Sequence, residues 1–214
     1  MASREKYMVS DLPTGQSGNM FIDRFTVGED DIPTNLYIAK RNNAPALVNP
    51  GVYTRLSEMD HFGHSRLWMV DTPTEIEDHM ECITHIESLK HGKILINGLG
   101  LGLVLKAAIQ AGTVDEITVV EIDMDIIKLV EQHYQRMARK HGVKLHIIHG
   151  NAMTQDPIPV YDVVWHDIWQ RAEPSNASSM AKLHNIYADH AVWQGSWRQT
   201  EVVHQMIEAR NHLV

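Results

Sequence analysis

Three glycines at alternate positions, Gly98, Gly100 and Gly102, interrupt an apolar run in the segment KILINGLGLGLVLKAA (residues 93–108). Because alternate glycines weaken a strand and cost about 1 kcal/mol each inside a helix, the pattern predicts a sharp turn. A turn of this kind after a strand lets backbone N–H groups approach a ligand without an intervening side chain. The same glycines also fit a turn that serves packing alone, and the glycines by themselves leave both interpretations open.

The sequence separation between this turn and a following carboxylate is informative. Glu121 closes the β-branched run EITVVEID and follows Gly102 by about 20 residues, the offset at which an acid in a nucleotide-binding sheet reaches ribose hydroxyls. A dinucleotide site prefers the spacing G-x-G-x-x-G, whereas this chain reads G-x-G-x-G and has Leu103 in place of the third glycine. The turn and the acid together favour a nucleoside ligand over a packing turn.

Asp167 is the second candidate for chemistry, in the segment YDVVWHDIW (residues 161–169). A carboxylate after a strand can bind and orient an amine, which has no lone pair until its ammonium form loses a proton. The alternative is an acid that caps the next segment. Trp165, His166 and Trp169 flank Asp167, and a tryptophan near a cationic group contributes about 0.5–2 kcal/mol. Core packing of these tryptophans explains them equally well.

The elements that would position these residues alternate between strand and helix. Short apolar or β-branched runs read as strands, and apolar residues at helical spacing read as helices. In order along the chain these segments are 93–98, 103–112, 116–123, 124–142, 144–152 and 161–169. Such alternation predicts an α/β fold with a parallel sheet that is covered on both faces.

A helix with a readable beginning precedes the glycine turn, in DTPTEIEDHMECITHI (residues 71–86). Thr72 and Glu75 match the T-x-x-E capping box, and Pro73 falls at the first helical position, where its missing N–H is harmless. Asp71 either belongs to the cap or reaches the cofactor pocket. Cys82 lies within the expected helix and reads as an inert small side chain.

Composition limits the classes of function. Of the 214 residues, 43% are hydrophobic and 21% charged, as in a globular protein, and the net charge of −8 opposes the basic surface of a nucleic-acid-binding protein. A single cysteine excludes an intramolecular disulfide, and the 14 histidines lack a metal-binding pattern such as H-E-x-x-H. We therefore expect no metal site. Because neither a signal peptide nor a membrane span is recognisable, we expect a cytoplasmic protein.

The ordered segments ILINGLGLG, VVEID, HGNA and YDVVWHDIW resemble the class I S-adenosylmethionine-dependent methyltransferases, most closely the branch that contains spermidine synthase. With DTPTEIEDH and WQGSW added, the chain looks like short methyltransferase-like proteins of bacteria and their phages. The resemblance implies a Rossmann-like fold that binds S-adenosylmethionine. It also implies that Asp167 is the catalytic residue. The cofactor-binding residues that it implies are Asn97, Gly98, Gly100, Gly102, Glu121, Ile122, Asp123, Asn151, Ala152 and Asp167.

One of these positions departs from the family pattern. Asn151 in HGNA stands where the family often has an aspartate that contacts the adenine amino group. An amide carbonyl can accept the same hydrogen bond without a charge. The resemblance therefore extends to this contact, although the residue type differs.

The two ends of the chain are less regular than its middle. We expect residues 1–70 to form a lead-in, mobile around residues 10–18, and a small β extension that acts as a substrate wall, a subunit contact or a structural flap. Residues 71–214 then form the Rossmann-like domain with C-terminal helices. No further strand is recognised after Asp167, which predicts a C-terminally truncated sheet of order 3-2-1-4 whose open edge is covered by the N-terminal strands or by another subunit. Residues 193–197 (WQGSW) read as a lid or as a hydrophobic staple.

The function implied by the resemblance is transfer of a methyl group from S-adenosylmethionine to a small nucleophilic acceptor, oriented or deprotonated by Asp167. One alternative is aminopropyl transfer from decarboxylated S-adenosylmethionine, as in spermidine synthases. Another is a protein that binds S-adenosylmethionine or serves assembly without turnover. The expected partners are a small-molecule acceptor and, in a homo-oligomer, further copies of the chain; nucleic acid and membrane are not expected.

Overall fold

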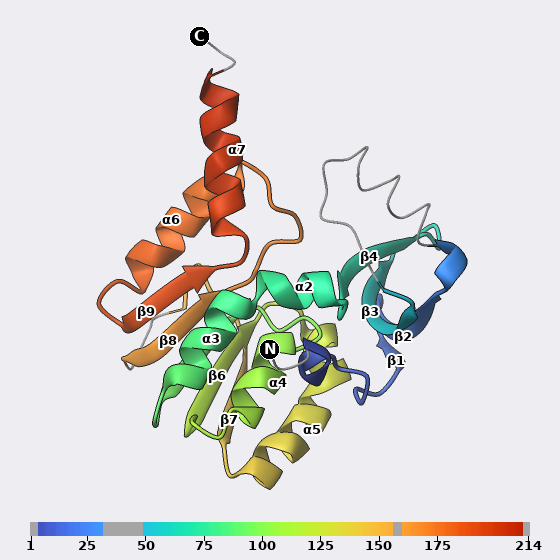
Figure 1. Cartoon of the computed structure of the whole chain (residues 1–214), viewed down its shortest axis with the longest axis horizontal. Coiled ribbons are helices and arrows are strands. Elements are labelled where there is room, and N and C mark those ends of the chain that lie inside the picture. Colours follow the sequence, from blue (N-terminus) through green and yellow to red (C-terminus); the bar gives the residue numbers. More distant parts are fainter. Residues whose placement is uncertain (1–3, 32–48, 156–159, 212–214) are drawn as a thin grey trace.

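The computed structural model describes residues 4–31, 49–155 and 160–211. It contains two sheets that stand side by side (Figure 1). The N-terminal sheet is antiparallel, with strand order β1-β2-β3-β4, and the larger sheet is parallel, with order β7-β6-β5-β8-β9. Helices accompany the parallel sheet, so the predicted α/β class with a small N-terminal β extension is confirmed.

The elements follow one another in the order of their numbers. The strands are β1 (Gly15–Ser17), β2 (Met20–Val27), β3 (Gly51–Met59), β4 (Ser65–Val70), β5 (Lys93–Asn97), β6 (Glu116–Glu121), β7 (Lys144–His149), β8 (Tyr161–His166) and β9 (Ala191–Ser196). The helices are η1 (Arg4–Tyr7), η2 (Glu29–Asp31), α2 (Pro73–Asp78), α3 (Met80–Ser88), α4 (Leu103–Gln110), α5 (Met124–His141), α6 (Asn176–Ile186) and α7 (Gln199–Asn211).

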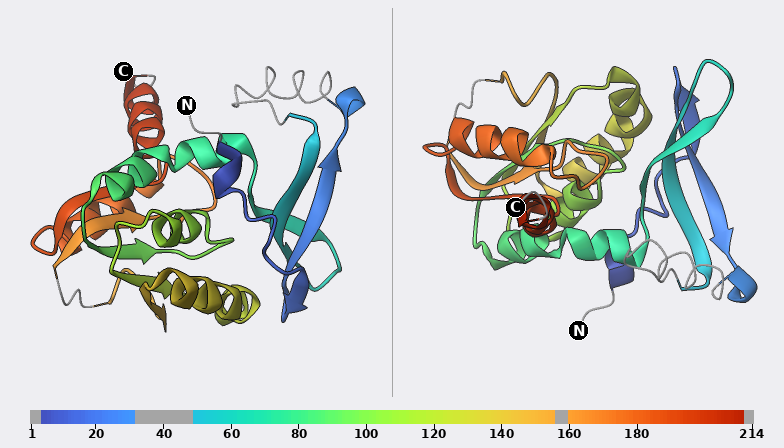
Figure 2. Two further views of the ribbon diagram at one scale, coloured as in Figure 1. Left: turned by 60° about the horizontal axis from the view of Figure 1, so that its bottom comes forward. Right: turned by 90° about the horizontal axis from the view of Figure 1, so that it is seen from above.

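The central strand of the parallel sheet, β5, directs apolar side chains to both faces of the sheet, and both faces are therefore covered. Ile94 and Ile96 of β5 belong to a large core that includes residues of α3, α4 and α5. Leu95, which points to the other face, belongs to a second core with Leu183 and Tyr187 around α6. The two further views show these two layers of helices with the sheet between them (Figure 2).

The strand register brings the candidate residues to one edge. Asn97, the last residue of β5, pairs with Val120 of β6 and with His166 of β8. The residues that follow these three positions are Gly98, Glu121 and Asp167. Since the carboxyl ends of parallel strands meet at the same edge of a sheet, this register alone assembles the predicted site.

The C-terminal part of the sheet differs from the expectation. The first four parallel strands have the predicted order 3-2-1-4, but a fifth strand, β9, pairs with β8 in parallel. The interpretation of WQGSW as a lid or a staple is therefore wrong, since Trp193 to Ser196 lie in a strand. Trp193 stacks on His85 with ring centroids 4.0 Å apart, and Gly195 is needed because a Cβ there would lie 2.7 Å from the Trp193 ring.

The predicted helix before the glycine turn is present but divided. Thr72 caps α2 by accepting a hydrogen bond from the Glu75 N–H at 3.4 Å, and Pro73 occupies the first helical position, as predicted. Instead of continuing, the chain passes through His79, which separates α2 from α3. This interruption buries the His79 side chain completely.

In the lead-in, which we expect to be mobile around residues 10–18, two side chains contact the rest of the protein. Leu12 is buried, and Asp11 accepts a hydrogen bond from Lys106 Nζ of α4 at 2.7 Å. Asp71 anchors this region, because its two carboxylate oxygens accept from the N–H groups of Val9 and Thr54 at 3.0 and 2.6 Å. Asp71 therefore links the segment around Val9 to β3, and it is not among the residues that line the cavity described below. Residues 36–48 of the expected β extension lie outside the described residues.

In the part of the chain that the structure describes, no helix has the length and apolar character needed to cross a membrane.

Candidate active site

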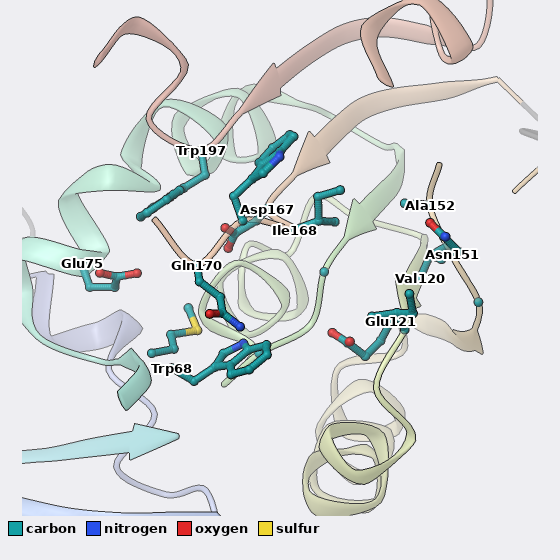
Figure 3. Close-up of a pocket in the computed structure, with 16 residues that line it drawn as sticks. Trp68, Glu75, Val120, Glu121, Asn151, Ala152, Asp167, Ile168, Gln170 and Trp197 are labelled. Atoms are coloured by element: carbon teal, nitrogen blue, oxygen red, sulfur yellow. The ribbon is translucent and has the colours of Figure 1, made fainter. Parts of the chain in front are cut away.

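A cavity of about 190 Å³ opens at the carboxyl ends of the parallel strands (Figure 3). Its walls come from the glycine turn, the ends of β6 and β8, the turn after β7, and residues from β4, α2 and the end of β9. The lining residues are Trp68, Met69, Glu75, Gly98, Gly100, Val120, Glu121, Ile122, Gly150, Asn151, Ala152, Asp167, Ile168, Trp169, Gln170 and Trp197.

The three glycines of the turn have left-handed backbone conformations, with φ of 99°, 49° and 79° at Gly98, Gly100 and Gly102. A Cβ at Gly98 would lie 2.0 Å from the carbonyl oxygen of Asp167, and one at Gly102 would lie 2.4 Å from the Tyr134 ring. Packing within the protein therefore requires both glycines. Gly98 and Gly100 also line the cavity, whereas Gly102 caps α4 and does not.

Glu121 is held between the turn and the next helix. It is 6% exposed, and its Oε2 and Oε1 atoms accept hydrogen bonds from the N–H groups of Leu99 and Asp123 at 2.7 and 2.8 Å. Each carboxylate oxygen has a second lone pair, so both can still accept from a ligand hydroxyl. Ile122 also lines the cavity, whereas Asp123 does not and instead caps α5 through its Oδ1 atom, which accepts from Asp125 N–H at 2.8 Å.

The turn after β7 brings Asn151 and Ala152 to the cavity, as the resemblance implies. The Asn151 Oδ1 atom accepts a hydrogen bond from the Met153 N–H at 2.9 Å, which orients the amide. Its carbonyl keeps one lone pair for a donor on a ligand.

Asn97 lies behind the cavity. It is fully buried, and its Nδ2 atom is 2.9 Å from Nδ1 of His166, whose Nε2 atom is 3.2 Å from Oε1 of Gln194. An amide NH₂ can only donate, so His166 carries its proton on Nε2 and donates to Gln194. Burial lowers the pKa of His166 to about 4, which keeps the ring neutral. The network joins the ends of β5, β8 and β9 beneath the site.

Asp167 lies in the cavity wall directly after β8. Its N–H donates to the Asn97 carbonyl at 2.7 Å, which continues the sheet ladder and fixes where the carboxylate leaves the strand. The next helix, α6, begins at Asn176, so Asp167 does not act as its cap. Burial raises the pKa of Asp167 well above its ordinary value, and the negative charges of Glu75 and Glu121 raise it further.

Glu75 is a cavity residue that the sequence interpretation missed. The T-x-x-E motif explains its backbone contact with Thr72, and the motif gave no sign that the side chain would line the cavity. The pKa of Glu75 is raised to about 7, chiefly by burial and also by the charge of Asp78, while Arg198 acts in the opposite direction. Position 75 precedes His79 by four residues, the spacing that places two residues on the same side of a helix, and this relation is the sequence signal that could have indicated its direction.

His79 lies behind the two carboxylates. Its Nε2 atom is 3.8 Å from Asp167 Oδ2 and 4.0 Å from Glu75 Oε1. Among the described residues, neither ring nitrogen has a hydrogen-bond partner, and burial lowers the pKa of His79 to about 4. A neutral imidazole with one N–H therefore adjoins both acids.

Three tryptophans complete the walls: Trp68 of β4, Trp169 after β8 and Trp197 after β9. Trp169 is oriented by its Nε1–H, which donates to Ser179 Oγ at 2.9 Å. Trp197 is followed by Arg198, which has a φ of 49° and forms an ion pair with Asp78 of α2 at 3.7 Å. Trp165, in contrast, is 1% exposed and belongs to the core.

The cavity has two chemically different sides (Figure 3). Glu121, Asn151 and Ala152 lie on one side, Glu75, Trp68 and Trp197 lie on the other, and Asp167 lies between them. Among the described lining residues are three carboxylates, and none is lysine or arginine. A cationic ligand would favour the ionised forms of Glu75 and Asp167, whose pKa values are raised without it, so the cavity suits a ligand with positive charge.

Histidine and acidic residues elsewhere do not gather into a metal site: within the described ranges, no group of three or more His, Cys, Asp or Glu side chains could hold a metal ion.

Comparison with solved structures finds distant methyltransferases. A putative caffeoyl-CoA O-methyltransferase from Staphylococcus aureus is 17% identical, with a TM-score of 0.40, and the match covers 75% of this chain and 61% of that one. The N-methyltransferase NodS from Bradyrhizobium japonicum is 14% identical, with a TM-score of 0.44, and the match covers 56% of this chain and 64% of that one. The present chain thus spans less than two thirds of either protein.

A third structure, the putative methyltransferase yhhF from Escherichia coli, is 16% identical, with a TM-score of 0.42 and coverage of 62% of this chain and 72% of that one. No significant match is found among curated proteins. The model of the spermine/spermidine synthase domain matches residues 77–189, more than half of the chain and the part that holds the glycine turn, Glu121 and Asp167. The chain therefore belongs to the spermine/spermidine synthase domain family, within the superfamily of class I S-adenosylmethionine-dependent transferases.

Proposed function

We propose that this protein transfers a methyl group from S-adenosylmethionine to a small amine acceptor. The observation that carries the proposal is the two-sided cavity, in which an acidic side walled by tryptophans adjoins the side that contains Glu121, with Asp167 between them. An amine acceptor is cationic in neutral solution, and this acidic, aromatic side suits such a charge.

The residues present fit a nucleoside sulfonium. Glu121 retains lone pairs for two ribose hydroxyls, Ile122 offers an apolar surface that is 64% exposed, and Asn151 retains an amide carbonyl for an adenine amino group. Gly98 and Gly100 present bare backbone to the cavity. The bound sulfonium would supply an electrophilic carbon and a neutral thioether leaving group.

The chain's own contribution is orientation and proton handling. Asp167 lies where the two sides meet, so its carboxylate can hold the acceptor nitrogen by a hydrogen bond and align it with the donor. Alignment of two reactants in one cavity accounts for a large part of the acceleration expected of such an enzyme. Because an ammonium must lose a proton before it attacks, a carboxylate on the acceptor side has to receive that proton.

Aminopropyl transfer from decarboxylated S-adenosylmethionine is a second candidate, and a specific observation favours it. The methionine end of S-adenosylmethionine carries a carboxylate, whereas the described lining of the cavity holds three carboxylates and neither lysine nor arginine. The decarboxylated donor ends in an ammonium group instead. This charge pattern would suit it, and the two donors have to be compared directly.

Isothermal titration calorimetry with S-adenosylhomocysteine, S-adenosylmethionine and decarboxylated S-adenosylmethionine tests the donor site. We expect binding that weakens by roughly 10- to 100-fold in Glu121→Ala, because hydrogen bonds to a charged group contribute about 1.5–3 kcal/mol. The matched control is Glu116→Ala, at the opposite end of the same strand, which should bind like the wild type. Failure of the wild type to bind any of the three nucleosides would overturn the proposal.

Mass spectrometry of reactions with primary and secondary amines tests the transfer itself. A mass increase of one methyl group on the amine supports the first candidate, and an aminopropyl increase supports the second. Nucleoside binding without alkylation of any amine in the panel would contradict transfer to amines and would support a protein that only binds the nucleoside.

A further inference from the structure

We propose that Glu75 is the proton acceptor of the reaction and that Asp167 holds the acceptor nitrogen in line with the donor, an assignment that rests on the proposed transfer to an amine. The sequence gives Glu75 only the role of a helix cap. In the structure its backbone N–H serves the cap while its carboxyl group faces the cavity, on the side with Trp68 and Trp197 (Figure 3). The backbone and the side chain of this residue therefore have separate uses.

Position is the first support for this assignment. Glu75 and Asp167 come from elements on different sides of the cavity, α2 and the end of β8, yet each has a carboxyl oxygen within 4.0 Å of the same His79 Nε2 atom. A small amine between these acids would contact both. Asp167 also borders the side with Glu121, whereas Glu75 does not, so Asp167 is the better placed of the two to align a nitrogen with the donor.

The charged groups around Glu75 suit a proton acceptor. Asp78 on its own helix raises its pKa, Arg198 from the turn after β9 lowers it, and His79 and the Asp167 carboxyl group adjoin it. Burial is the largest influence, and the three effects together place the pKa at about 7. An ordinary alkylammonium has a pKa of about 10, so a carboxylate of pKa about 7 accepts its proton with a much smaller penalty than an exposed glutamate would.

His79 is a positioning residue in this arrangement. Its ring is fully buried and neutral, so it can give one N–H to whichever of the two carboxyl groups is ionised. Both ring nitrogens lack a partner among the described residues, and a buried polar atom without a partner costs about 1–3 kcal/mol. A small shift toward either acid would remove this cost at Nε2.

The proposed step balances in protons and electrons. The ammonium R–NH₃⁺ gives one proton to the Glu75 carboxylate, which becomes a carboxylic acid. The freed nitrogen lone pair forms the new C–N bond while the C–S bond breaks and its electron pair neutralises the sulfur. The product leaves as R–NH₂⁺–R′ with the neutral thioether, and Glu75 returns its proton to water. No oxidant or metal is required.

Matched variants test the assignment in steady-state kinetics. Glu75→Gln is expected to lower kcat by roughly 100-fold and to remove the acidic limb of the pH–rate profile near pH 7, because the amide cannot accept a proton. Affinity for S-adenosylhomocysteine should stay within about twofold of the wild type. Glu77→Gln, on the same helix but outside the cavity lining, should keep the wild-type profile. A Glu75→Gln enzyme with wild-type kcat and pH profile would overturn the assignment.

A second measurement does not depend on turnover. In protein labelled with ¹³C at glutamate carboxyl groups, the resonance that disappears in Glu75→Gln should titrate near pH 7 and shift to lower pH when propylamine is added to protein saturated with S-adenosylhomocysteine. Titration near pH 4.5 without a response to the amine would reject Glu75 even if amines are alkylated. A responsive resonance in a protein that alkylates no amine would reject the proposed transfer while retaining Glu75 as an amine-binding group.

Discussion

Gly102 and Gly112 have similar backbone conformations, with φ of 79° and 71°, but different surroundings. A Cβ at Gly102 would overlap the ring of Tyr134, which is fully buried and donates its hydroxyl proton to the Leu101 carbonyl. A Cβ at Gly112 would meet nothing within 4 Å. The pair therefore separates the cost of a left-handed backbone from the cost of a steric clash.

Gly102→Ala is expected to lower the free energy of unfolding by about 3 kcal/mol or more, since strain and overpacking add, whereas Gly112→Ala should lower it by only about 1 kcal/mol. Urea unfolding followed by circular dichroism measures both. Equal losses in the two variants would show that Tyr134 moves aside freely and that packing does not explain Gly102.

Some residues of the site could be predicted from the sequence, and others could not. The glycine turn, Glu121 and Asp167 follow apolar strands directly, so parallel pairing brings them together and they could be predicted. Glu75 could not, because its capping motif accounts for the residue by local contacts and its orientation toward the cavity depends on how α2 packs. Trp68 comes from the antiparallel sheet, and its approach to the site depends on the placement of one sheet beside the other.

At the scale of elements, apolar patterns in the sequence predicted strands β5, β6 and β8. They also predicted helix α5, whose C-terminal end is marked by Gly142. β9 was not predicted, because its Gln194 and Gly195 interrupt the apolar pattern and its one tryptophan, Trp193, packs on His85 of a distant helix. The polar side chain of Gln194 accepts the hydrogen bond from His166 of β8. The residue that breaks the apolar pattern of β9 therefore also links β9 to β8.

The buried network at these strand ends predicts a pH effect on stability. A histidine whose folded pKa lies below its unfolded value of about 6.5 stabilises the fold above that value and loses this contribution as the pH falls toward the folded pKa. For His166 the folded pKa is about 4, so the contribution disappears between about pH 6.5 and pH 4. His79 has the same sign and a similar range.

The matching variant is His166→Gln, which keeps hydrogen-bonding capacity but cannot become cationic. Between pH 7 and pH 4 the wild type should lose up to about 3 kcal/mol more unfolding free energy than His166→Gln, measured by chemical denaturation at each pH. Using the difference between the two proteins removes the opposite contributions of Glu75 and Asp167, whose raised pKa values favour folding as the pH falls. Parallel stability curves for the two proteins would contradict a neutral buried His166.

At the scale of the whole molecule, Lys106 is one of several residues that attach the N-terminal segment to the parallel-sheet unit, together with Glu87 and Asp125. The Lys106 side chain of α4 is 9% exposed, and its ammonium group donates to the Met8 carbonyl at 2.6 Å and to Asp11 at 2.7 Å. The attachment holds buried Leu12 in place and so orders the chain that leads into β1. The segment thus belongs to the core and is not an appendage.

Lys106→Met should keep the aliphatic contacts and lose the two polar ones. We expect amide hydrogen exchange at Val9 and Leu12 to accelerate by roughly tenfold or more, because each lost hydrogen bond to a charged group contributes about 1.5–3 kcal/mol. Lys128→Met, at an exposed lysine of α5, is the control and should leave these amides unchanged. Unaltered exchange in Lys106→Met would show that the segment is held by its other contacts, such as the hydrogen bond from Val9 N–H to Asp71, and not by Lys106.

The two sides of the cavity have different origins along the chain. Residues 98–152 supply the side with Glu121 as one continuous stretch, whereas the side with Glu75 combines β4, α2 and the turn after β9, and Asp167 after β8 lies between them. Under the proposed transfer, evolution could therefore exchange the acceptor by altering segments outside the stretch that would hold the nucleoside. Descendants of such a protein would then keep one donor and diverge in what they alkylate, with changes concentrated at positions such as Trp68, Glu75 and Trp197.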